Sequence, residues 1–321
     1  MPITKEHKSI EDRITILENR GLKFRNKQRA ICILTKYNYF DIINGFESIL
    51  LSQSSPTKMF DDVYFEDFYD LYQFDMCLKK HTLFLILDIE SRLKTSVSYH
   101  FTGKYCDTAA KTLEYVNPQN YCTPVPNDTH LSKAFSKHEL FETTQRYNNG
   151  TFKSKSFLDR YNKKPAYMGQ YQKPPFWVAI KQLTFGPLYY LFLFLDNNTQ
   201  AKVLNDFNFD SHDLKAYQQA MFILNKMRNE CAHLELVSRF KLKHDKNLNF
   251  FAEIIALCNL SKTDICYRDV LKILHALGST LHIRIAIGLF YLKMSLKGRR
   301  KIAQKILGKM GRKSIYEWLV L

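Results

Sequence analysis

The residues best suited to chemistry in this chain form one short string, Arg228-Asn229-Glu230-Cys231-Ala232-His233. A histidine has a pKa near neutrality and can move protons at physiological pH, whereas an arginine keeps a fixed, planar positive charge. Attack of a ribose 2′-hydroxyl on the adjacent phosphodiester needs both: one group for the proton and one for the charge that develops on the phosphate oxygens. The string therefore predicts RNA cleavage with no metal ion or other cofactor, with Arg228 and His233 as catalytic residues.

The spacing of the string adds a geometric condition. At 3.6 residues per turn, positions five apart lie about 140° apart around a helix, so Arg228 and His233 of one ideal helix point in different directions. Asn229 and His233 are four apart and share a face. A two-fold contact between two copies of the helix would bring two arginines and two histidines into one cleft. The motif thus predicts a homodimer.

The alternative for this hexapeptide is an arginine and a histidine on a solvated helix face. The chain has 47 Lys plus Arg and 10 His among 321 residues, so the same spacing also arises by chance.

The charge balance points to a polyanionic partner. The formal net charge is +16, and an excess of this size attracts nucleic acid through phosphate contacts and counterion release. The alternative is a generally basic surface with no such partner. Cys258, Cys266 and His275 match no common zinc spacing, and the odd number of cysteines with no C-x-x-C pair is typical of reduced thiols. No segment is long and apolar enough to cross a membrane and the first residues are polar, so we expect a cytoplasmic protein with no stable membrane insertion.

Few turn-forming residues, 11 Gly and 9 Pro, and apolar residues at helical spacing predict an all-α fold. We expect capped helices after Ser9 and Asn26, a stop at Asn44-Gly45, and two long helices, or one broken near Lys80, over 60–101. A basic, loop-rich insert should span about 103–172, with one helix over 131–148. A helical pattern resumes at Pro175. We expect this helix to stop at Gly186-Pro187 and another to begin after it. Asp210-Ser211 should cap the helix that carries the motif, whose apolar stripe runs from Leu214 to Leu234. These features give a domain over 1–240 and a helical basic extension over 241–321.

The C-terminal tail is rich in basic residues and contains no acid between 293 and 313. We expect it to form a basic amphipathic helix that binds RNA; an anionic membrane surface and a solvated terminal helix are the alternatives. The predicted RNA-binding residues are Arg299, Arg300, Lys301, Lys305, Lys309, Arg312 and Lys313.

Four blocks in order carry a resemblance to a known family: 37–46 (Tyr-Asn-Tyr-Phe-Asp-Ile-Ile-Asn-Gly-Phe), 71–75 leading to 89–92, 175–177 with 183–186, and 228–233. Together they resemble the Abi-like abortive-infection proteins of the AbiD/AbiF type, within the HEPN group of helical ribonucleases. The resemblance implies a HEPN-like helical bundle, usually dimeric, a metal-independent endoribonuclease activity, and a toxin-like role in phage defence. It carries over Arg228 and His233 as the catalytic pair and Asn229 as the polar residue beside the arginine. Glu90 or Arg92 would supply a supporting charge, and a small noncoding RNA or a protein antitoxin would restrain the activity.

Two further hypotheses compete with the ribonuclease. One is a non-catalytic RNA-binding module that holds a structured small RNA, with Arg228 as a phosphate contact only. The other is a membrane-associated effector that acts through the basic tail.

Overall fold

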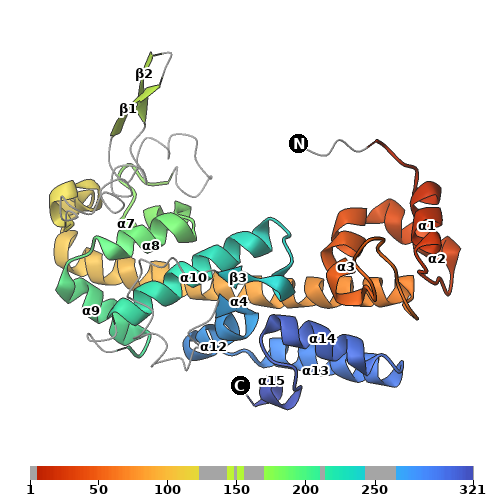
Figure 1. The fold of residues 1–321 in the computed structure, drawn as a ribbon. Coiled ribbons are helices and arrows are strands. Elements are labelled where there is room, and N and C mark those ends of the chain that lie inside the picture. Colours follow the sequence, from red (N-terminus) through yellow and green to blue (C-terminus); the bar gives the residue numbers. More distant parts are fainter. Residues whose placement is uncertain are drawn as a thin grey trace. The chain divides into compact units, whose positions relative to one another are not determined.

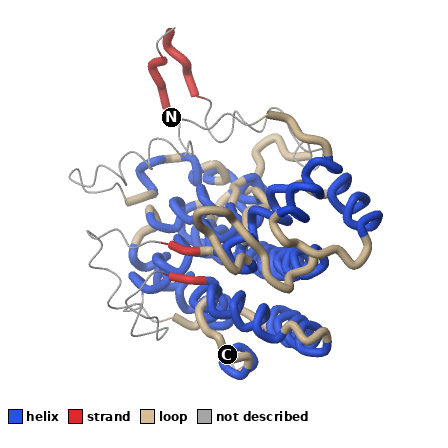
Figure 2. Tube along the Cα trace, turned by 45° about the vertical axis from the view of Figure 1, so that its right-hand side comes forward, coloured by secondary structure: helices blue, strands red, loops and turns tan. Residues whose placement is uncertain are grey.

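The computed structural model describes residues 6–122, 143–147, 150–154, 170–209, 214–242 and 265–320. Helices make up most of this part of the chain, and its strands are confined to two short pairs (Figure 2). The expected all-α fold is confirmed. The chain divides into two compact units: the first holds 1–85, 229–244 and 263–321, and the second holds 86–228 and 245–262.

The first unit begins with two short helices whose caps were predictable. Helix α1, Ile10–Asn19, starts with a capping box in which Ser9 and Asp12 exchange side-chain and backbone hydrogen bonds, and Gly21 follows it with φ +83°. Helix α2, Lys27–Lys36, is capped by the Asn26 side chain. Both predicted helix starts are confirmed because each depends only on local chemistry.

The predicted stop at Asn44-Gly45 is wrong. A π-helical turn, η1 (Phe40–Asn44), runs directly into helix α3, Gly45–Leu50. Gly45 has helical angles, φ −56° and ψ −39°, and a Cβ added there would lie 2.6 Å from Leu236 Cδ1. The glycine therefore serves a close approach of the 234–240 segment to α3 rather than a turn.

Helix α4, Phe65–Tyr105, is one continuous helix with no break near Lys80 (Figure 1). Its buried apolar stripe includes Leu71, Leu78, Ile86 and Leu93. At position 82 a fully buried threonine continues the stripe and hydrogen-bonds to Tyr267 Oη at 2.7 Å. The helix contributes residues to both compact units.

The second unit contains η2 (Ala109–Lys111), η3 (Glu114–Val116), η4 (Pro118–Asn120), α7 (Phe176–Ala179), η7 (Ile180–Gln182), α8 (Phe185–Leu193) and α9 (Asn197–Asp206). Gly186 and Pro187 do not stop a helix as expected; they lie in the first turn of α8, where proline removes no helical hydrogen bond.

The helix expected over 131–148 is wrong where the structure describes it. Residues Thr143–Tyr147 form strand β1, which pairs antiparallel with β2, Gly150–Ser154. The β-branched Thr143, Thr144 and Thr151 favour extended backbone over helix. The rest of the expected helix lies outside the described residues, as does the Asp210-Ser211 cap.

The C-terminal part of the first unit has strands β3 (Lys241–Leu242) and β4 (Ile265–Cys266), then α12 (Tyr267–Leu277), α13 (Leu281–Leu296), α14 (Arg300–Met310) and α15 (Tyr316–Leu319). The tail is therefore not one amphipathic helix. The backbone turns at Gly298, where φ is +71°, and α13 and α14 pack on each other.

Candidate functional site

The motif lies at the C-terminal end of helix α10, Leu214–Ala232. The helix buries Tyr217, Met221, Leu224 and Cys231 on one side, as the predicted apolar stripe requires. Leu234, expected to continue that stripe, does not: it lies beyond the helix with φ +62° and is 59% exposed. The chain reverses direction here, because the Glu235 amide donates back to the Glu230 carbonyl at 2.9 Å.

His233 directly follows the last helical residue. Its amide donates to the Asn229 carbonyl at 2.9 Å, so the helical hydrogen bonding reaches one residue further. Asn229 and His233 are both exposed, whereas Arg228 is half-buried. The His233 imidazole has no hydrogen bond or ion pair with any residue that the structure describes. Asn229 and His233 are thus both exposed at the end of α10, and helical spacing puts Arg228 about 140° around the axis from His233.

A buried ion pair on α4 holds the segment that follows His233. Lys79 Nζ donates to the Leu234 carbonyl at 2.9 Å and lies 3.5 Å from Asp75 Oδ2. The other Asp75 oxygen accepts the Ser238 amide at 2.8 Å. Only 5% of the Lys79 side chain and 1% of the Asp75 side chain are exposed.

Burial raises the pKa of Asp75, and its hydrogen bonds with Ser238 and the charge of Lys79 oppose that rise. Sequence reasoning missed this pair as a functional element. The sequence indicates the pair only through an acid and a base that stand four residues apart inside the apolar stripe of a long helix.

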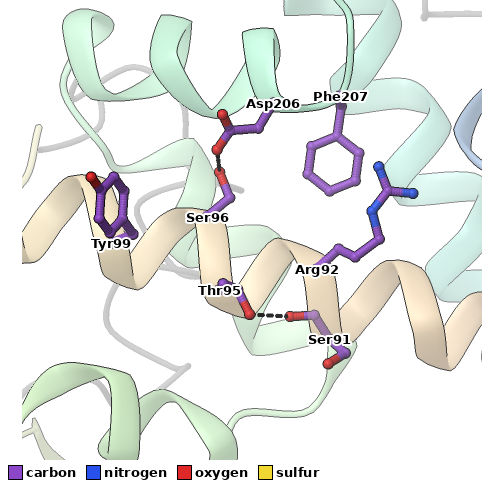
Figure 3. Close-up of a pocket in the computed structure, with 7 residues that line it drawn as sticks. All are labelled: Ser91, Arg92, Thr95, Ser96, Tyr99, Asp206 and Phe207. Carbon is purple, nitrogen blue, oxygen red and sulfur yellow. Dashed lines mark hydrogen bonds between the residues drawn. The ribbon is translucent and has the colours of Figure 1, made fainter.

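The two supporting charges expected on α4 have partners of their own. Glu90 is buried and pairs with Lys94, with Oε1 and Nζ 2.7 Å apart. Arg92 holds its guanidinium 4.9 Å from the centre of the Phe207 ring, and Figure 3 shows the two side chains next to each other. A supporting role for either residue toward Arg228 stays a prediction.

Many basic residues of the tail are engaged within the first unit. Arg299 lies 2.8 Å from Asp62 and 3.5 Å from Asp67. Lys293 and Lys297 both pair with Asp70, Lys305 donates to the Ile49 carbonyl at 3.2 Å, and Arg312 pairs with Glu317. The tail has no acid of its own between 293 and 313, but acids from other segments neutralise part of it.

The remaining tail residues predicted to bind RNA differ in whether they have a partner within the protein. Arg300 is exposed and donates to Tyr291 Oη at 2.7 Å. Lys301, Lys309 and Lys313 are exposed and form no ion pair within the described ranges. These three lysines are the tail positions most available to a phosphate.

Two general features complete the description. Among the described residues, no group of three His, Cys, Asp or Glu side chains is arranged to hold a metal ion. Cys258 lies outside those residues, and the Cys266 thiol donates to Asp269 at 3.3 Å. No helix in the described ranges has the length and apolar character needed to cross a membrane.

Comparison with known proteins gives one match. The model of a family described as Abi-like protein matches residues 32–237, a range that begins within α2 and includes the whole Arg228-to-His233 motif. No curated protein and no solved structure matches the chain.

Proposed function

Because the chain belongs to the Abi-like protein family, whose members act in abortive infection, we propose that it is a metal-independent endoribonuclease of the HEPN type. In this proposal it acts as a toxin-like effector in defence against phage. A small noncoding RNA or a protein antitoxin would inhibit its ribonuclease activity.

The observation that carries the proposal is the state of His233. Its imidazole is exposed and has no partner among the described residues, although the backbone on both sides of it is fixed by hydrogen bonds. A general base must reach the proton that it removes, and an exposed imidazole with no partner in the described part of the chain can do so. In this proposal Asn229, one turn earlier on the same face, holds the imidazole or the phosphate.

The reaction follows from the residue types. His233 takes the proton of the ribose 2′-hydroxyl, the 2′-oxygen forms a bond to phosphorus, and the bond from phosphorus to the 5′-oxygen breaks. The leaving 5′-oxygen takes a proton from water, and His233 returns its proton to the solvent. Arg228 binds the phosphate oxygens and stabilises the charge that develops on them. The products are a 2′,3′-cyclic phosphate and a 5′-hydroxyl.

Arg228 and His233 point in different directions along one helix, so we propose that two chains of a homodimer together supply the pair. The second candidate function, a non-catalytic RNA-binding module, is favoured by the net charge of +16. In such a module Arg228 would contact a phosphate and His233 would have no catalytic role.

The test compares the rates at which purified proteins cleave end-labelled RNA, with the products resolved by their termini. His233→Ala should lower the rate by about 10²–10⁴-fold, the usual contribution of general acid–base catalysis. His275→Ala, at an exposed histidine of α12, should cleave at the parental rate. Activity should persist in EDTA. Parental cleavage by folded His233→Ala would remove the catalytic assignment, and RNA binding without cleavage by the parent would favour the second candidate.

A further inference from the structure

One side of α4 in the second unit is hollowed along its length. A hollow of about 790 Å³ lies over Tyr99 to Lys104 and reaches Trp177 and Lys202. Another of about 510 Å³ runs from Leu87 to Ser98 and also reaches Trp177. A third of about 280 Å³ lies between Ser91 and Phe207 (Figure 3). Thr95 lines all three, so they join into one surface, which we call the α4 groove.

Trp177 is an exposed aromatic side chain in this groove. It belongs to the short helix α7, where its neighbours Phe176, Val178 and Ala179 are buried. Trp177 itself is 56% exposed. The buried neighbours anchor the backbone at this position, and the exposed indole lines two of the hollows. An exposed tryptophan in a hollow is the kind of side chain that a ligand covers.

Tyr99 supplies a second aromatic surface. It is 74% exposed on α4 and lines the largest hollow together with Trp177. Its ring and the ring of His100 form a T-shaped pair with centroids 5.2 Å apart, and most of the Tyr99 side chain is open to a ligand. Two exposed aromatic rings in one hollow suit planar, unpaired bases.

The groove carries the charge that a nucleic-acid backbone needs. Its lining includes five cations, Arg92, Lys94, Lys104, Lys181 and Lys202, and two acids, Glu90 and Asp206, so the lining is net positive. Lys94 pairs with Glu90 and Lys104 with Asp196. Lys202 is exposed and forms no ion pair within the described ranges. The lysine therefore has its full charge available for a phosphate.

From these observations we propose that the α4 groove binds single-stranded RNA, with unpaired bases stacked on Trp177 and Tyr99 and phosphates near Lys202. The inference takes RNA as the ligand from the proposed function and names its class. A duplex fits the groove poorly because the bases of an A-form helix are stacked on each other and present no free face. The groove is a binding surface and holds no part of the Arg228–His233 pair.

The chain itself provides a probe, because it has only two tryptophans. Trp318 is fully buried, and its Nε1 donates to the Arg312 carbonyl. In a Trp318→Phe protein, all tryptophan fluorescence comes from Trp177. Single-stranded RNA should change this fluorescence and protect it from acrylamide quenching, and a duplex of the same sequence should do neither at the same concentration.

Affinity measurements complete the test. They use the His233→Ala background so that no RNA is cut, and fluorescence anisotropy of a labelled single strand. Trp177→Ala and Tyr99→Ala should each weaken binding by about 5- to 150-fold, the range for loss of one stacked base, and Trp177→Phe should retain most of the affinity. The matched control is Tyr316→Ala, at a tyrosine 70% exposed outside the groove, which should bind normally.

The outcomes separate this inference from the proposed function. Unchanged affinity in folded Trp177→Ala and Tyr99→Ala, or equal protection by duplex, overturns the groove assignment even where the parent cleaves RNA. Binding that depends on Trp177 supports the groove even where no cleavage is found.

Discussion

Arg228 and His233 are held in different ways, and the difference bears on how they can act together. His233 is exposed at the end of α10, whereas Arg228 is half-buried one residue before Asn229. The Asn229–His233 hydrogen bond preserves helical geometry up to the histidine, so the five-residue offset of about 140° still applies. A pair arranged in this way is better completed by two chains than by one.

Complementation tests this composite site. Arg228→Ala and His233→Ala should each be inactive alone. After unfolding and refolding of an equal mixture, about a quarter of the parental activity should return, since half of the dimers are mixed and one of their two sites is intact. Each variant refolded alone is the control. A mixture as inactive as its components, with mixed dimers shown by mass, would place both residues of each site in one chain.

At the scale of elements, the start of a helix was easier to predict than its end. Ser9 and Asn26 cap their helices through bonds to residues three positions on, so the local sequence contains all the information. Gly45 was misjudged because the atom that explains it, Leu236 Cδ1, comes from a distant part of the chain. The tail was misjudged for a related reason: the acids that pair with Lys293, Lys297 and Arg299 are on or just before α4.

The same limit applies to the candidate site. The Arg228-to-His233 string is visible in the sequence because it is contiguous. The contact of Lys79 with the Leu234 carbonyl joins α4 to the segment that follows α10, a pairing that no local pattern specifies. This contact makes α4 the support for the chain segment that follows the histidine.

Lys79→Met tests that support. The substitution removes one partner of a buried ion pair and leaves the buried Asp75 carboxyl without its cation, so it should lower the free energy of unfolding by about 3–5 kcal/mol. Adding Asp75→Asn should recover much of the loss, because the amide oxygen can still accept the Ser238 amide. Urea unfolding followed by circular dichroism gives both values. An equal midpoint for Lys79→Met and the parent would show that the pair contributes nothing to the fold.

At the scale of the whole molecule, the net charge of +16 has to be divided between cations that the fold uses and cations that a ligand can use. The pairs of Arg299 with Asp62 and Asp67 and of Lys297 with Asp70 belong to the first group. Lys301, Lys309 and Lys313 belong to the second. Truncation of the tail would not separate these two groups of cations. It would also destabilise the fold, because α13 and α14 bury Ile287, Met294 and Ile306.

We therefore expect the tail lysines to act through the salt dependence of binding. A triple variant with Gln at Lys301, Lys309 and Lys313 should have a weaker salt dependence. The magnitude of the slope of log affinity against log salt should fall by about 2, at about 0.7 per contact with a single strand. A second triple variant, Lys8, Lys36 and Lys80 to Gln, removes the same three charges from exposed positions elsewhere and should change the slope less. Equal slopes for the two variants would mean that only net charge matters. Trp177→Ala should weaken binding at every salt concentration without changing the slope, because stacking releases no counterions; the two contributions are thereby separable in one titration series.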